Sequence, residues 1–162
     1  MIYWGMASTY TVERTAVLTA DPQTVYASIA DFKKWRAWSP WEELDPDLER
    51  NYSGTDHGVG SIYSWSGNKK AGQGRMEISE AVPGRKVRIR LDFVKPFKSQ
   101  NVTTFSLTPE GAGTRVVWQM VGPRPTLMRI FGFIFNMDKL VGKDFEKGLA
   151  AMKAKVEGAA VS

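Results

Sequence analysis

The chain has 162 residues, of which 43% are hydrophobic and 24% are charged, a composition typical of a soluble globular domain and not of a disordered or fibrous protein. It contains no cysteine and one histidine, His57, which excludes disulfides and thiol chemistry and argues against zinc sites. The formal net charge of +5 favours anionic partners in general, but the basic residues are spread along the chain. We expect one domain over 1–162, with residues 1–8 as a loose extension, and no metal or cofactor.

The first part of the chain predicts a strand followed by a helix. Residues 9–18 are rich in Thr and Val, as strands are. Asp21 then stands where a helix N-cap oxygen is needed, and Pro22 occupies the first helical position. Val25 and Ile29 recur at helical spacing and indicate the buried face of this helix.

Three tryptophans, Trp35, Trp38 and Trp41, follow within seven residues. Pro40 and Pro46 interrupt this segment, so it can hold only short helical turns. A tryptophan combines a large apolar body with one N–H donor. The three side chains could therefore plug a core, line a cavity or face a membrane.

From there the hydrophobic period changes to two, which predicts an antiparallel sheet. The expected strands are residues 48–54, 60–66, 72–82, 85–94, 101–109 and 113–122, the last two joined by the hairpin signal "EGAG". The strand over 85–94 alternates most clearly. Val87, Ile89, Leu91 and Phe93 face one way, and Lys86, Arg88, Arg90 and Asp92 face the other.

The chain closes with apolar residues spaced three or four apart from 127 to 156, which predicts one long helix with a single apolar stripe. A sheet with one apolar face and a helix with one apolar stripe must bury them together. We therefore expect an α+β fold, in which a curved antiparallel sheet of about six to seven strands wraps around the C-terminal helix.

The order of these pieces resembles the helix-grip superfamily, also called START-like or birch-pollen-allergen-like, and within it the polyketide cyclase/dehydrase family. The resemblance covers roughly residues 8–157. It rests on "ADPQTVYASIADFKKWRAWSPW", on the succession of strands and on "MDKLVGKDFEKGLAAMKAKVE". It implies a deep cavity between sheet and long helix, open at one end.

Within such a fold the tryptophans would border the mouth or upper wall of the cavity. Alternatively they plug one end of the sheet, with Trp38 and Trp41 structural and Trp35 more exposed; both interpretations can hold together. The inward faces of strands and helix supply the candidate ligand-binding residues. These are Trp38, Trp41, Tyr63, Trp65, Met76, Ile78, Ile89, Leu91, Phe93, Phe105, Trp118, Met120, Phe131, Phe135, Val141 and Phe145. Gly132 and Gly142 are expected to leave space along the helix.

The sequence does not show an active site. It contains no nucleophile–base pairing, no carboxylate pair of suitable spacing and no phosphate-binding loop. Tyr63 and Asp144 are the candidates for proton transfer, and His57 is expected in an exposed Gly-rich turn.

We therefore expect a carrier or sensor for a small hydrophobic molecule, such as a lipid, an isoprenoid or an aromatic metabolite. One alternative is a cyclase or dehydratase acting on an aromatic or polyketide substrate. Another is an interaction module like the chaperone activators of the superfamily. The three classes differ in what the cavity should contain: few polar groups, converging titratable groups, or filling side chains.

Partners and location follow from charge and hydropathy. The stripe of Lys86, Arg88 and Arg90, and the loop with Lys95, Phe97 and Lys98, could make transient contact with an anionic membrane or an acidic protein. The alternative is that the stripe is simply a solvated surface and that Phe97 packs locally within its loop. No nucleic-acid-binding pattern occurs, and a monomer or homodimer is expected. The N-terminal residues do not resemble a secretory signal and no apolar run is long enough for a membrane span, so we expect a cytoplasmic protein.

Overall fold

The computed structural model of the protein describes residues 9–95, 98–123 and 137–161. The expected extension at residues 1–8, and the calls on Phe97, Phe131, Gly132 and Phe135, lie outside these described residues.

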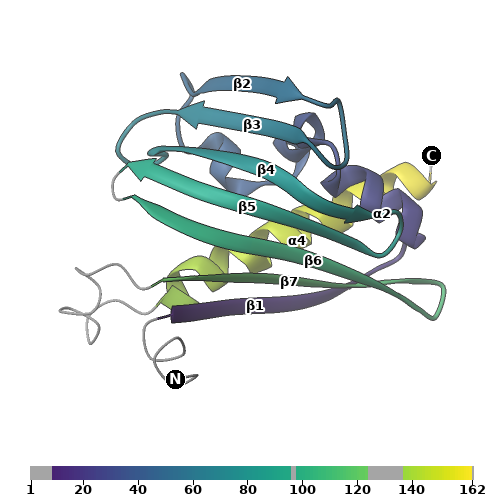
Figure 1. The fold of residues 1–162 in the computed structure, drawn as a ribbon. Helices are drawn as coiled ribbons and strands as arrows, with labels where there is room; N and C mark the ends of the chain where they lie inside the picture. The colour runs from purple at the N-terminus through teal and green to yellow at the C-terminus, as the bar shows by residue number, and fades with distance from the viewer. Residues whose placement is uncertain (1–8, 96–97, 124–136, 162) are drawn as a thin grey trace.

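Seven strands form one antiparallel sheet, as the alternating sequence pattern predicts (Figure 1). They are β1 (Thr9–Leu18), β2 (Glu49–Gly54), β3 (Ser61–Ser66), β4 (Gln73–Val82), β5 (Lys86–Lys95), β6 (Ser99–Glu110) and β7 (Gly113–Pro123). Their order in the sheet is β1-β7-β6-β5-β4-β3-β2. Strands β2 to β7 each pair with the strands that precede and follow them in this series, whereas β1 pairs with β7, the last strand. The first and last strands therefore lie side by side.

The helical segments lie on one face of the curved sheet (Figure 1). They are α2 (Pro22–Ile29), the 3-10 turns η1 (Phe32–Ala37) and η2 (Pro40–Glu43), and α4 (Met137–Val161). Helix α4 packs chiefly against β1 and continues beyond residue 156, where its apolar stripe was expected to end. This arrangement confirms the α+β helix-grip fold class, with a short helix after the first strand and a long C-terminal helix.

The start of α2 differs in one detail from the expected cap. Asp21 occupies the N-cap position with extended backbone, and Pro22 begins the helix as predicted. However, the Asp21 carboxylate accepts a hydrogen bond from the Thr24 hydroxyl, and this side chain makes no capping bond to the backbone.

The core lies between the inner face of the sheet and the helices. On β5, Val87 and Ile89 are fully buried while Arg88 and Arg90 are exposed, as the alternation predicts. The largest fully buried side chains include Phe105 on β6 and Phe145 on α4. Apolar burial of this kind contributes about 25 cal/mol per Å² to folding and holds the helices on the sheet.

Two glycines allow close packing against the sheet. A Cβ at Gly74 of β4 would lie 2.4 Å from the Trp65 ring, so the missing side chain lets the indole lie over that strand. A Cβ at Gly142 would lie 2.1 Å from the end of the Arg14 side chain. Gly142 therefore faces β1, and the expectation that it leaves cavity space is wrong.

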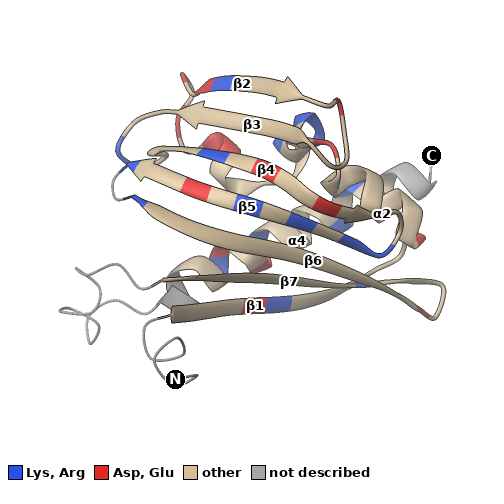
Figure 2. Cartoon of the chain, in the orientation of Figure 1, with Lys and Arg blue, Asp and Glu red and all other residues tan. Residues whose placement is uncertain are grey.

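The outer face of the sheet carries mixed charge (Figure 2). Lys86 pairs with Glu80 at 3.0 Å, and Arg90 lies 3.8 Å from Asp92. The basic stripe predicted from β5 is thus interleaved with acidic side chains of β4 and β5. None of the helices in the described part of the chain is long and apolar enough to cross a membrane.

Candidate ligand-binding cavity

A cavity of about 170 Å³ lies between the inner face of the sheet, the η1–η2 segment and helix α4. It is lined by Tyr10, Trp35, Ser39, Trp41, Glu42, Leu48, Tyr63, Trp65, Ala71, Met76, Leu91, Phe93, Thr103, Trp118, Met120, Val141 and Phe145. Its wall is mainly aromatic and aliphatic. A closed apolar cavity of about 150 Å³ in another protein accommodates benzene, so this volume suits a body of about one ring.

The structure brings most of the sequence-predicted candidates to this cavity. Those that line it are Trp41, Tyr63, Trp65, Met76, Leu91, Phe93, Trp118, Met120, Val141 and Phe145. Those that do not are Trp38, Ile78, Ile89 and Phe105, which are buried in the core instead. Phe131 and Phe135 lie outside the described residues.

Strand register locates the border of the cavity. Met76 of β4 is paired with Leu91 of β5, and both line the cavity. The next inward pair, Ile78 and Ile89, is fully buried and does not line it. Residues of both pairs point to the same face, so sequence periodicity alone cannot separate wall from core. The cavity occupies one end of the inner face and solid packing occupies the other.

The tryptophan segment forms part of the wall and also fills space beside it. Trp35 and Trp41 line the cavity, whereas Trp38 packs edge-to-face on Trp118 at 5.5 Å between ring centroids. The expectation that Trp35 is more exposed is wrong, since only 5% of its surface is accessible. Its indole N–H donates a 2.8 Å hydrogen bond to the Ile29 carbonyl, which anchors the ring below the end of α2.

Trp118 is the centre of an aromatic stack that joins β7 to α4. Its ring lies 4.0 Å from that of Phe145 at an angle of 8°, and 4.7 Å from that of Phe105 at 29°. Gly148 makes room for the indole, since a Cβ there would lie 2.9 Å from the Trp118 ring. Such contacts stabilise beyond area burial alone, so this wall of the cavity is well ordered by packing.

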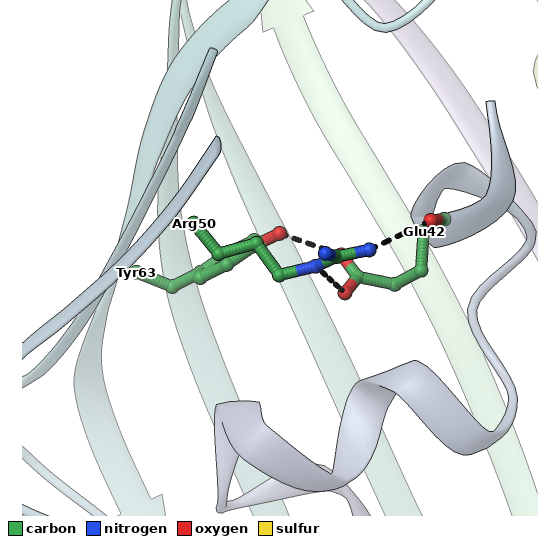
Figure 3. A network of polar contacts seen from close by, with 3 residues as sticks. All are labelled: Glu42, Arg50 and Tyr63. Atoms are coloured by element: carbon green, nitrogen blue, oxygen red, sulfur yellow. Dashed lines mark hydrogen bonds and ion pairs between the residues drawn. The ribbon is translucent and has the colours of Figure 1, made fainter. Parts of the chain in front are cut away.

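A polar network borders the apolar wall (Figure 3). The Tyr63 hydroxyl donates to Glu42 Oε2 at 2.6 Å, and Arg50 Nε donates to Glu42 Oε1 at 2.9 Å. Arg50 Nη2 also donates to the Glu42 backbone carbonyl at 2.9 Å. Burial of Tyr63, and then its hydrogen bond to Glu42, raise the pKa of the phenol, so the hydroxyl stays protonated. Both carboxylate oxygens thus have a donor.

A second set of polar groups lies on β1, β6 and β7. The Tyr10 hydroxyl donates to Asn101 Oδ1, and Asn101 Nδ2 donates to Ser99 Oγ at 2.9 Å. Burial raises the pKa of Tyr10 to about 12. On β6 and β7, Thr103 Oγ1 and Trp118 Nε1 are buried without a hydrogen-bond partner in the described part of the protein.

The second candidate for proton transfer does not reach the cavity. Asp144 is half-buried on α4, and this burial raises its pKa, but it is not part of the cavity lining. His57 is exposed in a turn, as expected. No group of three or more His, Cys, Asp or Glu side chains in the described ranges is arranged to hold a metal ion.

Sequence reasoning missed several lining residues, namely Tyr10, Ser39, Glu42, Leu48, Ala71 and Thr103, whereas Trp35 was expected at the cavity with the other two tryptophans but was not among the candidate ligand-binding residues. Tyr10 and Thr103 lie on alternating strands whose inward face could have been chosen by period. Glu42 had no such signal, because only the geometry of η2 decides that Glu42 is buried while Glu43 is exposed.

Comparisons with known proteins agree on the fold. The family model described as polyketide cyclase/dehydrase and lipid transport matches residues 9–157. The Mll3558 protein from Rhizobium loti is similar with 25% identity and a TM-score of 0.61, over 91% of this chain and 95% of that one. None of the curated proteins matches the sequence.

Two further solved structures are similar at lower identity. The di-domain ARO/CYC protein StfQ from the steffimycin biosynthetic pathway matches with a TM-score of 0.74 and 12% identity, over 99% of this chain and 55% of that one. The Aha1 dimer from Colwellia psychrerythraea matches with a TM-score of 0.64 and 14% identity, over 91% and 96% of the two chains. At these identities the likeness is one of fold.

Proposed function

The chain belongs to the polyketide cyclase/dehydrase and lipid transport family, and we propose that it is a carrier or sensor that binds a small, largely apolar molecule without transforming it. The ligand lies between sheet and α4, in the cavity of about 170 Å³. The observation that carries this proposal is the wall itself, which is mostly aromatic and aliphatic.

Binding is driven by burial of the apolar surface of the ligand. Each Å² removed from water contributes about 25 cal/mol before the costs of association. Met76 and Met120 give the wall two deformable side chains, which adapt to ligands of different outline. Trp41 and Phe145 offer flat surfaces against which a ring can stack.

The polar network argues for binding over catalysis. A general acid or base must be free to exchange a proton with the substrate. The Tyr63 hydroxyl is engaged by Glu42, and Glu42 is also engaged by Arg50. These three groups satisfy one another, so they support a closed wall.

The alternative is a cyclase or dehydratase in which Tyr63 acts as general acid. This second candidate is favoured by one observation, that Tyr63 and Glu42 both line the cavity and share a 2.6 Å hydrogen bond. A substrate oxygen that replaced Glu42 as acceptor would receive the phenolic proton, and Glu42 could then act on a second proton. Tyr63→Phe distinguishes the two functions, because a carrier keeps its ligand affinity within about threefold whereas an enzyme loses turnover.

The first test of the proposal is native mass spectrometry of the protein purified from cells, beside the same sample after denaturation. We expect an additional mass that leaves on denaturation and whose exact value gives the chemical class of the ligand. A clean apo mass, together with failure of aromatic and lipid compounds to quench the fluorescence of the cavity tryptophans, would contradict the proposal.

A matched pair of variants locates the binding site. Val141→Phe adds a ring to the cavity wall on α4 and should remove quenching by the ligand. Val17→Phe makes the same change at an exposed position of β1, 45% accessible, and should leave binding intact. Equal loss of binding in both variants would place the ligand elsewhere.

A further inference from the structure

The described part of the cavity wall contains one charged residue, Glu42. The other described lining residues are apolar or aromatic or carry a neutral hydroxyl, and none of them is a lysine, an arginine or a histidine. The Glu42 side chain is buried, with 8% of its surface accessible. A buried carboxylate needs partners, because burial removes the water that stabilises its charge. The contacts of Glu42 therefore decide which charge a ligand meets.

Two side chains hold the Glu42 carboxylate in place (Figure 3). The Tyr63 hydroxyl donates to Oε2 at 2.6 Å, and Arg50 Nε donates to Oε1 at 2.9 Å. An ionised carboxylate only accepts hydrogen bonds, and this is the form that two donors, one of them a guanidinium, fit. The wall thus contains a fixed negative charge.

The ion pair presents its negative member to the cavity. Glu42 lines the cavity, whereas Arg50 does not and instead borders a separate groove with Asn51 and Ser64. The Arg50 side chain is also the more accessible of the two, at 17%, so water and salt screen its charge more strongly. The Tyr63 hydroxyl directs its hydrogen at Glu42. Neither donor therefore offers its positive end to a ligand.

An anion would be unfavourable at such a wall for two reasons. It would lose its hydration without meeting a basic side chain of the described lining, and it would be repelled by Glu42. Charges act over several Å in a medium of low dielectric constant, so this repulsion needs no contact between the ligand and the carboxylate. An uncharged molecule of the same shape has neither cost.

We propose that the cavity selects uncharged apolar molecules over ionised carboxylates of the same shape, and that Glu42 determines this selectivity. The inference rests on the proposed ligand-binding function and adds the charge of the ligand. The ligand class is a neutral compound such as an arene, an alcohol or a ketone, and ionised fatty acids and aromatic acids are rejected.

The test compares nitrobenzene and benzoate, which have nearly the same shape and differ in charge, by NMR titration of the full chain at pH 7. Glu42→Gln removes the negative charge and keeps the length of the side chain. Glu43→Gln makes the same change in net charge at the next residue of η2, which is exposed. The melting temperature of each variant shows whether it is folded.

The wild type should bind nitrobenzene at least about tenfold more tightly than benzoate. Glu42→Gln leaves the charge of Arg50 unopposed beside the wall, so it should raise benzoate affinity by about tenfold and change nitrobenzene affinity by less than about threefold. Glu43→Gln should keep the preference of the wild type.

A second measurement uses the wild type alone and does not depend on the folding of a variant. Carboxylic acids ionise at about pH 4, so the uncharged fraction of benzoic acid rises about tenfold between pH 6 and pH 5. If only this form binds, the apparent affinity for benzoic acid rises by the same factor. The affinity for nitrobenzene, which does not titrate, should stay constant.

The opposite outcomes separate this inference from the function on which it rests. Equal affinity of the wild type for the two probes at pH 7, or an affinity for benzoic acid that is constant with pH, would show that the cavity does not reject anions. If a folded Glu42→Gln variant rejects benzoate as the wild type does, the role of Glu42 is wrong. If neither probe binds the wild type, the proposed function itself is overturned.

Discussion

The hydroxyl of Tyr63 lies 2.6 Å from Glu42 Oε2, which joins strand β3 to the 3-10 turn η2. Arg50 of β2 completes the link through the other carboxylate oxygen and the Glu42 carbonyl. The aromatic ring of Tyr63 also stacks on Tyr52, with 5.1 Å between centroids. The tryptophan segment is thereby fastened to the edge of the sheet that contains β2 and β3.

The contribution of this link can be measured with two tyrosines that stack on each other. Tyr63→Phe removes a donor to a buried carboxylate, and we expect it to lower the free energy of unfolding by about 1.5–3 kcal/mol. Tyr52→Phe removes a buried hydroxyl that has no partner among the described residues, so it should be neutral or stabilising. Urea denaturation of both variants measures the free energy of unfolding. Equal decreases in the two variants would show that the hydrogen bond from Tyr63 to Glu42 does not contribute to stability.

Glu42 and its neighbour Glu43 offer a similar comparison. Glu42→Ala removes the carboxylate that accepts from Tyr63 and from Arg50 Nε, while Arg50 keeps its bond to the backbone carbonyl of residue 42, so we expect a loss of about 1.5–3 kcal/mol. Glu43 is exposed, and Glu43→Ala should change stability by no more than about 0.5 kcal/mol. Thermal and urea unfolding give the two values. A loss below about 1 kcal/mol for Glu42→Ala would mean that the network relaxes around the missing carboxylate.

Two glycines of α4 should respond differently to alanine. At Gly148 a Cβ would lie 2.9 Å from the Trp118 ring, which is held in a stack, so Gly148→Ala should destabilise by about 1–2 kcal/mol. At Gly142 the Cβ meets the flexible end of Arg14, which can move aside. Gly142→Ala should then be neutral or stabilising by up to about 1 kcal/mol, through helix propensity. Calorimetry of both variants decides, and the reverse order would contradict the packing described.

Alkaline pH should destabilise the protein through its buried tyrosines. Burial raises the pKa of Tyr10 from 10.0 to about 12, so the folded state holds the phenolic proton more tightly than the unfolded state. The stability that this adds is fully present below pH 10 and is lost as the pH rises toward about 12. The urea midpoint of the wild type should fall across this window. The urea midpoint of Tyr10→Phe should fall less steeply, because this variant has no phenolic proton to lose at position 10. A flat profile in the wild type would contradict the burial of this hydroxyl.

The strands were predictable because one face of the sheet packs on the core and the other is exposed to solvent. On β5, hydrophobic Val87 and Ile89 alternate with charged Arg88 and Arg90, and a period of two has no other common explanation. The fold class followed from the need to bury the sheet face against one long apolar helix. The end of that helix was less predictable, because the apolar spacing ends at Val156 while α4 continues to Val161.

The sequence predicted which residues point to the inner face of the sheet, but not which of those residues line the cavity and which are packed in the core. Alternation shows that Met76 and Ile78 point inward, yet it contains no information on which of them meets a cavity and which meets a neighbour. The polar members were harder still, because burial of Glu42 depends on the direction of a single 3-10 turn. The exposure expected for Trp35 failed for the same reason, since its anchor, the Ile29 carbonyl, is supplied by the end of a helix.

The pairing of β1 with β7, from Thr9 against Pro123 to Leu18 against Thr114, has a consequence for how the chain is made. Strand β1 pairs with no strand other than β7, so it stays unpaired until β7 has been synthesised. Contacts this distant in sequence are typical of slow folding. Helix α4 follows β7 in the chain and supplies Val141 and Phe145 to the cavity wall, so the cavity cannot form during synthesis until α4 has left the ribosome.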